Sequence, residues 1–358
     1  MKYGGWLGVV ITAGSALTGC GARSELDVPC GGCPGPQVCC DGSCESLTDD
    51  PANCGACGRD CQGTACVDSM CEPITLADGL DSPMELALDA THVYWEGETS
   101  VGKVPIDGGA PTQLVTGLDY LLGIEVMGGE VYWTSNHSGH AGSGVWKVPV
   151  AGGSPTQLFT DQYGAFALGV DSTHVYFSSN DTIPDANGAA ISMLPVAGGP
   201  VLQLATGDLS PSYLTVDASH VYWTSNFYHT VSKVPIGGGA VVPIASAHNP
   251  RGIVVDATNI YWVQEDWIMK APIAGGAPIQ LAPIQGFGWH LAVDATHVYW
   301  IDHSWRILSK VPIGGGNPTV IAKVRSSAFG IAVDDTSVYW STYGNEDWMD
   351  GEVMKVTK

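Results

Sequence analysis

One short phrase returns seven times along the chain and limits the fold more than any other feature. It consists of a β-branched residue, a tyrosine and a second aromatic residue, and successive tyrosines lie 38 to 46 residues apart. A period of this length is typical of proteins that stack one supersecondary unit many times. The seven copies begin at Val93, Val131, Val175, Val221, Ile260, Val298 and Val338.

The repeat unit reads as four short strands. In the clearest copy, β-rich runs at 291–294, 297–300, 309–313 and 318–321 are separated by turn residues, and no segment has a helical period. Four antiparallel strands, here called A to D from the axis outward, are the unit of a propeller blade. The sequence therefore predicts an all-β chain with a seven-bladed β-propeller.

The last copy of the repeat lacks its fourth strand. It stops after a run at 354–356 that corresponds to strand C, whereas residues 73–77, just before the first copy, resemble the D strands at 111–115 and 278–282. We expect this N-terminal strand to complete the last blade, because that arrangement closes the ring and leaves no open sheet edge.

The beginning of the chain predicts its location. Lys2 and an apolar run over 7–17 precede Leu17-Thr18-Gly19-Cys20, which resembles the lipobox of a bacterial lipoprotein signal peptide. That resemblance implies removal of residues 1–19, acylation of Cys20 with palmitate among its chains, and, because Gly21 follows, an outer-membrane or cell-surface location with membrane contact through the lipid. The alternative is an ordinary secretory signal with a chance cysteine.

A cysteine-dense module at 30–72 follows a short linker at 20–29. It holds few large apolar residues, so it cannot build a core and should be held by five disulfides, whose pairing the sequence does not reveal. The alternative is that the pairs Cys30/Cys33 and Cys54/Cys57 bind zinc. The stretch 50–61 resembles the Cys-rich repeat of Stig1-like proteins, which implies an extracytoplasmic module without known chemistry. The ten cysteines are Cys30, Cys33, Cys39, Cys40, Cys44, Cys54, Cys57, Cys61, Cys66 and Cys71.

The net charge of −22 argues against nucleic acid as a partner. An acidic surface favours basic partners or divalent cations, and it also keeps a secreted protein soluble.

Several polar residues recur in nearly every copy and are therefore expected to build the blade. Aspartates recur at the turn between strands A and B, where a carboxylate accepts backbone N–H bonds, and histidines recur three residues later. Lysines recur in strand C. These residues are Asp89, Asp171, Asp217, Asp256, Asp294 and Asp334; His92, His174, His220 and His297; and Lys103, Lys147, Lys233, Lys270, Lys310 and Lys355.

The B–C and D–A loops differ between copies, and in a propeller both open on one face. A rigid frame with variable loops is how repeat proteins present binding surfaces, although drift in unconstrained loops is an alternative. The candidate binding residues of this predicted rim are Tyr228, His229, His248, Arg251, Trp267, Trp289, His290, His303, Trp305, Arg306 and Trp348.

No catalytic motif stands out, and no cofactor is predicted. Acids at Asp181/Asp185 and at Glu346/Asp347/Asp350 could offer oxygens to Ca²⁺ without the spacing of a known calcium loop, and His137/His140 lack a neighbouring acid. The alternative to a binding protein is a hydrolase or lyase at the mouth of the central channel that uses Glu85, Arg251 and His290.

The repeat resembles a known family. Tyr132-Trp133-Thr134 and Tyr222-Trp223-Thr224 resemble the YWTD propellers of low-density-lipoprotein receptors and their TolB-like and NHL-type bacterial relatives, over 73–358. The aspartate of YWTD is Ser135 or Ser225 here, and the copies number seven rather than six. The resemblance implies protein binding in most relatives and lactonase, lyase or glycan chemistry in a minority.

The sequence thus favours a protein- or glycan-binding module over an enzyme. We expect rim aromatics to carry most of the binding energy, unless the tryptophans fold back over the blades. Acids beside them (Glu265, Asp266, Asp302, Glu346 and Asp347) would steer a basic partner.

Overall fold

The computed structural model describes residues 33–136, 143–160, 164–179, 189–207, 209–325, 328–344 and 350–358. The predicted signal peptide, Cys20, the linker 20–29 and Cys30 lie outside these residues, as do His137, His140, Asp181, Asp185, Glu346, Asp347 and Trp348. All regular structure in the described ranges is β-strand. They contain no helix with the length and apolar character needed to cross a membrane.

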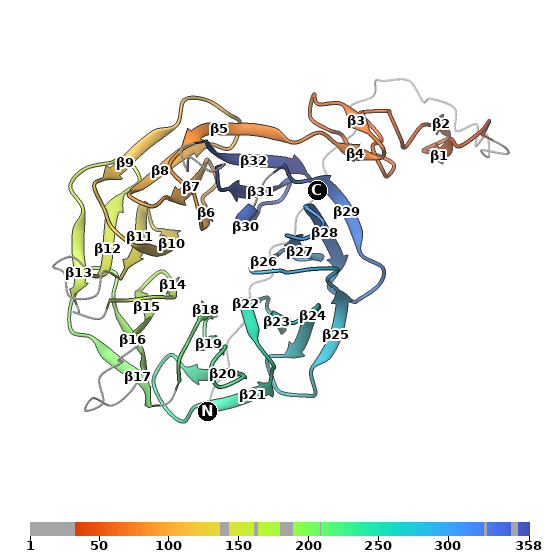
Figure 1. Cartoon of the computed structure of the whole chain (residues 1–358). Helices are drawn as coiled ribbons and strands as arrows, with labels where there is room; N and C mark the ends of the chain where they lie inside the picture. The colour runs from red at the N-terminus through yellow and green to blue at the C-terminus, as the bar shows by residue number, and fades with distance from the viewer. Residues whose placement is uncertain are drawn as a thin grey trace, which may run out of the picture.

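Seven four-stranded antiparallel sheets surround a central axis as blades (Figure 1). The first four blades are β6 (Leu86–Leu88), β7 (His92–Glu96), β8 (Ser100–Pro105) and β9 (Thr112–Thr116); β10 (Leu121–Met127), β11 (Glu130–Ser135), β12 (Gly144–Pro149) and β13 (Thr156–Thr160); β14 (Leu168–Val170), β15 (His174–Ser179), β16 (Ala189–Pro195) and β17 (Leu202–Gly207); and β18 (Tyr213–Val216), β19 (His220–Ser225), β20 (Thr230–Pro235) and β21 (Val242–Ser246).

The last three blades are β22 (Pro250–Val255), β23 (Asn259–Gln264), β24 (Trp267–Pro272) and β25 (Ile279–Pro283); β26 (Leu291–Val293), β27 (His297–Asp302), β28 (Ile307–Pro312) and β29 (Thr319–Lys323); and β30 (Ala328–Val333), β31 (Ser337–Thr342), β32 (Gly351–Thr357) and β5 (Ile74–Leu80). The innermost strand of each blade contacts those of both neighbours, so β6, β10, β14, β18, β22, β26 and β30 form a closed ring. The seven-bladed propeller predicted from the repeat is confirmed.

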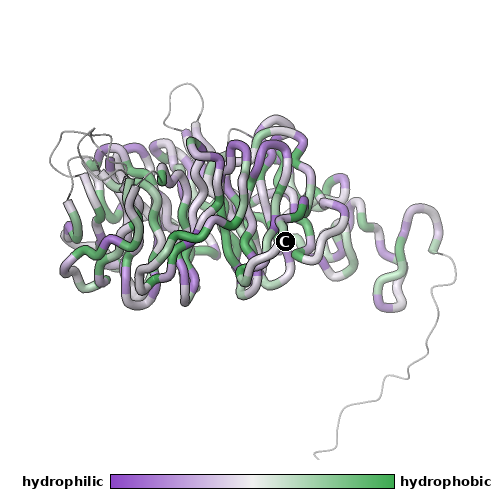
Figure 2. The backbone as a smooth tube through the Cα atoms, turned by 90° about the horizontal axis from the view of Figure 1, so that it is seen from below, coloured by the Kyte–Doolittle hydropathy of each residue, from purple (hydrophilic) through white to green (hydrophobic). Residues whose placement is uncertain are grey.

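The ring closes as the sequence predicts. Strand β5, near the start of the described chain, pairs antiparallel with β32, near its end, and supplies the fourth strand of the last blade. The expected strand limits in the sixth blade differ by a few residues from the observed ones: strand B runs on to Asp302 and strand C begins already at Ile307. Edge-on, the blades form a flat disc (Figure 2).

The repeated Tyr–Trp pair lies between blades. Adjacent residues of a strand point to opposite faces, so the tyrosine and the following aromatic residue face different neighbours. Tyr94 of the first blade packs with Trp133 of the second in one apolar cluster, whereas Trp95 packs with Tyr339 of the seventh. Seven such clusters, one at each junction, join a tyrosine to the aromatic residue of the next blade.

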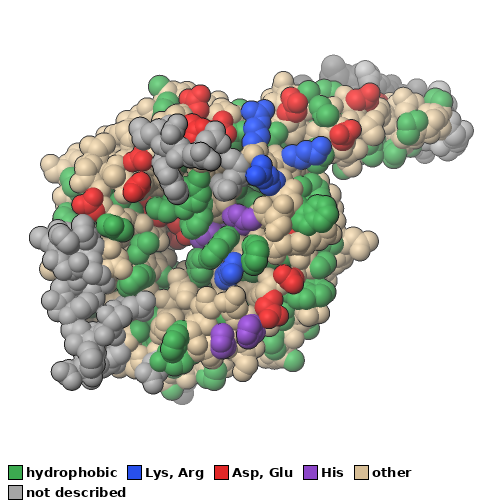
Figure 3. All heavy atoms as spheres, in the orientation of Figure 1, with side chains coloured by type: hydrophobic (Ala, Val, Ile, Leu, Met, Phe, Trp, Pro, Cys, Tyr) green, Lys and Arg blue, Asp and Glu red, His purple; other side chains and the backbone are tan. Residues whose placement is uncertain are grey.

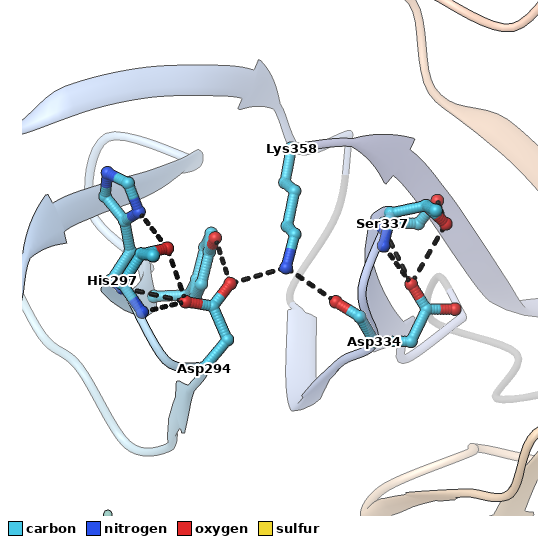
Figure 4. Close-up of polar contacts among 8 residues, drawn as sticks. Asp294, His297, Asp334, Ser337 and Lys358 are labelled. Carbon is cyan, nitrogen blue, oxygen red and sulfur yellow. Dashed lines mark hydrogen bonds and ion pairs between the residues drawn. The ribbon is translucent and has the colours of Figure 1, made fainter. Parts of the chain in front are cut away.

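The recurrent aspartates cap the A–B turns, as predicted. Asp294 Oδ1 accepts N–H bonds from Thr296 and His297 at 2.7 and 2.8 Å, and its Oδ2 accepts the Tyr299 hydroxyl at 2.8 Å (Figure 4). Equivalent bonds form at Asp89, Asp171, Asp217, Asp256 and Asp334. The aspartate thereby ties its turn to the tyrosine that fills the blade junction.

Most of the recurrent lysines tie one blade to the next. Lys103 Nζ donates to the Val150 carbonyl of the second blade at 2.7 Å. Lys233 and Lys270 donate in the same way to the Ile273 and Ile313 carbonyls of the blades that follow them. No such bond of Lys310 is present among the described residues, at the junction where β5 supplies the outer strand of the seventh blade. Arg59 Nη2 instead donates to Ile321 and Thr357 carbonyls at this junction, and Lys358 Nζ bridges Asp294 Oδ2 and the Asp334 carbonyl (Figure 4).

The Cys-rich module projects from the ring beside this junction (Figure 1) and contains β1 (Val38–Cys40), β2 (Ser43–Glu45), β3 (Cys66–Val67) and β4 (Met70–Cys71). Four of the five expected disulfides join described residues: Cys33–Cys44, Cys40–Cys57, Cys54–Cys66 and Cys61–Cys71. Cys39 is also disulfide-bonded. The thiols that the zinc alternative required, Cys33, Cys54 and Cys57 among them, are therefore oxidised in this structure.

We expect Asp217→Ala to lower the free energy of unfolding by about 1–3 kcal/mol, because the N–H groups of the turn and the hydroxyl of the buried Tyr222 lose their acceptor. Asp217→Asn keeps one oxygen and should cost less. Urea denaturation at neutral pH measures both. Equal stability of the alanine variant and the parent protein would contradict the capping role.

Candidate functional site

The central channel is built from one repeated position. This channel position lies ten residues before the aromatic residue of strand B in every blade, at or beside the start of the innermost strand. Four blades carry glycine or alanine there, and three carry a large polar side chain. The seven residues are Glu85, Gly123, Ala167, Tyr213, Gly252, His290 and Gly330.

The small residues let the backbones of neighbouring blades approach. A Cβ atom on Gly252 would lie 2.3 Å from the Trp289 carbonyl, and one on Gly330 would lie 2.4 Å from the Met84 carbonyl. The large residues occupy the space that remains. All seven innermost strands line a cavity of about 210 Å³, and Glu85, Tyr213 and His290 are among its lining residues.

Two of the three residues expected at the channel mouth come together. Glu85 and His290, from the first and sixth blades, contact each other with 3.3 Å between Oε1 and Nδ1. His290 is only 9 % exposed, and its Nε2 has no hydrogen-bond partner. Its ring meets Tyr213 edge-on at 5.3 Å and Phe329 at 4.7 Å between centroids. Burial raises the pKa of Glu85 to about 7 and lowers the pKa of His290 to about 4, so the pair is largely uncharged in mildly acidic water.

Two further glutamates lie near this pair, and sequence reasoning missed both. Burial and then the charge of Glu85 raise the pKa of Glu125 in β10 to about 7. The same two causes hold the pKa of Glu96, at the end of β7, well above its ordinary value. Glu96 is 1 % exposed, and its Oε2 lacks a partner. Glu85 and Glu125, from adjacent blades, therefore line the channel cavity together, and the buried Glu96 lies close to Glu85.

Arg251 is part of the rim rather than of the Glu85–His290 pair. Its guanidinium stacks 4.0 Å from the Trp289 ring centroid and 5.6 Å from that of Phe287. Such stacking orients a cation and leaves its donors available. The predicted triad of Glu85, Arg251 and His290 is thus divided into a buried pair and a stacked arginine.

Exposed aromatic side chains gather on the face of the B–C and D–A loops, here called the loop face. Figure 3 views this face, and apolar, His and basic (Lys or Arg) side chains lie around the channel mouth. Every aromatic side chain that is strongly exposed within the described ranges belongs to one of these loops: Tyr120, Phe227, Tyr228, Phe287, Trp289 and Trp305. The opposite face is built from glycine turns.

Backbone geometry separates the two faces as well. On the opposite face, left-handed conformations fall on glycines such as Gly152 and Gly275. On the loop face, residues with side chains adopt positive φ, a conformation that costs L-residues about 1–2 kcal/mol each. They are Ser82, Tyr120, Ser210, His229, Asn249, Glu265 and Arg306.

The predicted rim residues have different surroundings. His229 and His248 stack at 4.8 Å, and His248 Nδ1 lies 2.8 Å from Glu265 Oε1 on the surface. Trp267 is half-buried against the core of the fifth blade, as the folded-back alternative supposed. Trp305 is 61 % exposed although its indole N–H donates to the Gln285 carbonyl at 2.9 Å.

Burial lowers the pKa of His303, and the charges of the nearby His290 and Arg251 lower it further, whereas Arg306 is exposed. Asp302, expected to steer a partner, is 1 % exposed, and its carboxylate accepts the N–H groups of Ser304 and Trp305 at 3.0 Å each. That expectation was wrong, because the carboxylate is used to cap the loop.

Within the described residues, the one group of three potential ligands with donor atoms close together is Cys54, Cys61 and Cys71, and these are disulfide-bonded. The channel glutamates and His290 do not form such a group. The described part of the acidic calcium candidate at 346–350 is limited to Asp350.

Neither a protein-family model nor a curated protein matches the chain by sequence. Solved structures do match its fold. A streptogramin B lyase is 13 % identical with a TM-score of 0.63, covering 80 % of this chain and 96 % of its own. Virginiamycin B lyase from Staphylococcus aureus is 12 % identical with a TM-score of 0.63, covering 80 % and 98 %. A chain of a nidogen/laminin complex is 16 % identical with a TM-score of 0.53, covering 68 % and 98 %. At these identities the likeness establishes a propeller fold, in agreement with the propeller families that the repeat resembles.

We expect Glu125→Gln to stabilise the protein above about pH 7 and to change it little at pH 4. The wild-type carboxyl has a folded-state pKa of about 7, above its ordinary value of 4.5, so its contribution to the unfolding free energy falls as pH rises between these values. The uncharged side chain introduced by Glu125→Gln does not ionise, so the variant avoids this fall in the unfolding free energy. Melting temperatures of both proteins from pH 4 to 8 measure it; a difference independent of pH would contradict a buried, titrating carboxyl.

Proposed function

We propose that this protein is a lipid-anchored extracytoplasmic lipoprotein whose propeller binds a protein or glycan ligand on the loop face. One observation carries the binding proposal: the strongly exposed aromatic side chains of the described residues are concentrated on that face. Aromatic anchors of this kind bury apolar area against proteins and stack on sugar rings. The strained loop residues support it, because strain of this kind is retained where geometry serves function.

The location rests on the sequence resemblance at Leu17–Cys20 and on the disulfides of the module. Disulfide-dense modules persist in oxidising, extracytoplasmic compartments, which agrees with an exported chain. Acylation of Cys20 would hold the protein on the membrane by its N-terminal linker.

Cys20→Ser tests the anchor. We expect the variant to lose labelling with radioactive palmitate and to move from the membrane pellet to the soluble extracytoplasmic fraction. Retention in the pellet with unchanged processing would contradict lipid anchoring, whereas soluble secretion of the parent protein would favour an ordinary signal peptide.

Two sets of alanine variants test the loop face in the Cys20→Ser protein. The rim set is Phe227, Phe287, Trp289 and Trp305; the control set, with comparable exposure on the outer strands and opposite turns, is Val201, Leu202, Ile279 and Val320. Wild-type protein is first screened on glycan arrays and against purified surface proteins. A rim anchor commonly contributes about 2 kcal/mol, so we expect each rim substitution to weaken binding by about 30-fold and the control set to leave it unchanged.

Circular dichroism and melting curves must show intact folding of both sets. Loss of binding only from the control set would place the ligand on the outer strands or the opposite face and would overturn the proposal.

A second candidate function, hydrolysis or elimination at the channel mouth, is favoured by the contact of Glu85 with His290, because a neutral imidazole beside a carboxyl of pKa about 7 can exchange protons. Two of the proteins that share the fold are lyases. Mass spectrometry of the ligand after incubation separates the candidates: an unchanged ligand supports binding, and a cleaved ligand whose turnover is lost in His290→Ala supports the enzyme.

A further inference from the structure

Glu85 and Glu125, which line the channel, and Glu96 close to them are not required by the repeat. Two residues after the channel position, where the second blade has Glu125, the other blades carry uncharged residues: Ala87, Gly169, Thr215, Val254, Ala292 and Ala332. Directly after the strand B aromatic, where the first blade has Glu96, the others carry Thr134, Ser178, Thr224, Val263, Ile301 and Ser341. The repeat therefore does not need these acids, and the burial of Glu96 together with the half-burial of Glu85 and Glu125 opposes folding at neutral pH.

No cation offsets this charge within the part of the chain that the structure describes. The ion-pair contact of Glu85 is with His290, whose lowered pKa keeps the imidazole neutral at pH 7. Neither Glu96 nor Glu125 contacts a lysine or arginine there, and Arg251 is stacked on Trp289 rather than lining the cavity. Buried carboxylates ordinarily have an opposite charge beside them, so the channel has an acceptor for a cation that the described chain does not supply.

His290 provides a second, independent indication of a ligand. It lies 91 % buried among the residues that line the cavity, and its Nε2 lacks a hydrogen-bond partner. A buried polar atom of this kind costs about 1–3 kcal/mol unless something pairs with it. Tyr213 lines the same cavity and adds an aromatic surface that attracts a cation.

We propose that the central channel binds a primary ammonium group, received by the carboxylates of Glu85 and Glu125 beside His290 and Tyr213. An ammonium group is compact and carries three N–H donors, so a few acceptors and an aromatic ring are enough to hold it in a cavity of about 210 Å³. A divalent metal ion would need a tighter set of ligand atoms than the channel offers. The inference rests on the proposed loop-face binding and gives its ligand a chemical class: an amine, or a lysine side chain of a bound protein.

Binding of a cation should release protons. Glu85 and Glu125 both have a pKa near 7 in the empty channel, whereas an alkylammonium stays charged up to about pH 10. A bound cation favours the ionised carboxylates, so affinity should rise with pH through 7. If one carboxyl controls binding, the ionised fraction rises about tenfold between pH 6 and 8. The other groups that face this pair are Glu96 from β7, Tyr213 from β18, Arg251 from β22, His290, and Tyr343 after β31.

Isothermal titration of the otherwise full-length Cys20→Ser protein with n-butylammonium tests the site directly, and 1-butanol is its uncharged isostere. We expect n-butylammonium to bind at least tenfold more tightly than 1-butanol at pH 8, about tenfold more weakly at pH 6 than at pH 8, and with net proton release in buffers of different ionisation enthalpy. Equal affinity for the alcohol, pH-independent binding, or tighter binding of Ca²⁺ or Mg²⁺ alone would overturn the proposal.

Two variants locate the site. Glu85→Gln and Glu125→Gln should each weaken n-butylammonium binding at pH 8 by at least tenfold, whereas Glu98→Gln, an exposed acid in the B–C loop of the same first blade, should leave it unchanged. If either channel variant fails to fold, the pH dependence and the alcohol control in the parent protein still decide. Full binding in both folded channel variants would contradict the site.

Titration with Nα-acetyl-lysine methylamide and with its Nε-acetylated form distinguishes a lysine side chain of a protein from a free amine as the ligand. Preference for the free lysine side chain over n-butylammonium supports a protein ligand, and the reverse preference supports a free amine. The two proposals fail separately: rim variants that lose the ligand while n-butylammonium still binds leave the channel site standing. A rim ligand that binds normally to a protein without affinity for any amine overturns only the channel site.

Discussion

The fold depends on two adjacent aromatic residues in the second strand of each blade. Neighbouring residues of a strand point to opposite faces, so a tyrosine followed by a tryptophan packs one blade against both of its neighbours. The buried pairs Tyr222/Trp262 and Tyr261/Trp300 belong to two successive junctions, and the last junction, Tyr339 with Trp95, closes the series. In six of the seven blades the aspartate of the A–B turn then fixes the tyrosine by its hydroxyl, which joins the local turn to the packing of the ring.

Repetition explains why so much of the architecture could be predicted from the sequence. A residue type that returns at one place in six or all seven copies, such as Asp217 or Tyr222, must satisfy the same local geometry each time, so its structural role is visible without coordinates. Contacts that occur once are different. Arg59 bonds to Ile321 and Thr357, which lie 262 and 298 residues away, and nothing in the local sequence distinguishes it from a solvated arginine. It acts where the series of interblade lysine bonds is interrupted by the N-terminal strand, and that place is known only once the ring is assembled.

The functional face was predictable in part. The loop lengths indicated which side varies, and Glu85 and His290 were placed at the channel mouth from the repeat register. Tyr213 occupies the same register position but was not among the residues predicted at the channel mouth. Glu96 and Glu125 were missed for a related reason: their importance comes from burial and mutual repulsion, which depend on how the first two blades meet. Asp302 shows the opposite error, since a loop acid that looks solvated is the cap of its own loop.

Residues at equivalent positions of the seven blades show which side chains the propeller needs for folding and which it does not need. At the channel position, small residues such as Gly252 and Gly330 are needed because the next backbone lies within contact distance of any side chain there. Where a blade instead carries Glu85, Tyr213 or His290, the ring has accepted a large polar group at a place where packing alone favours glycine or alanine. A large polar residue at this position adds no packing to the apolar clusters. It also leaves the Glu85 carboxyl, with its raised pKa, beside the unpaired Nε2 of His290. A rigid closed ring can tolerate such groups because seven aromatic junctions stabilise it independently of the channel. The same independence is what allows the channel and the loops around it to vary in chemistry while the blades stay the same.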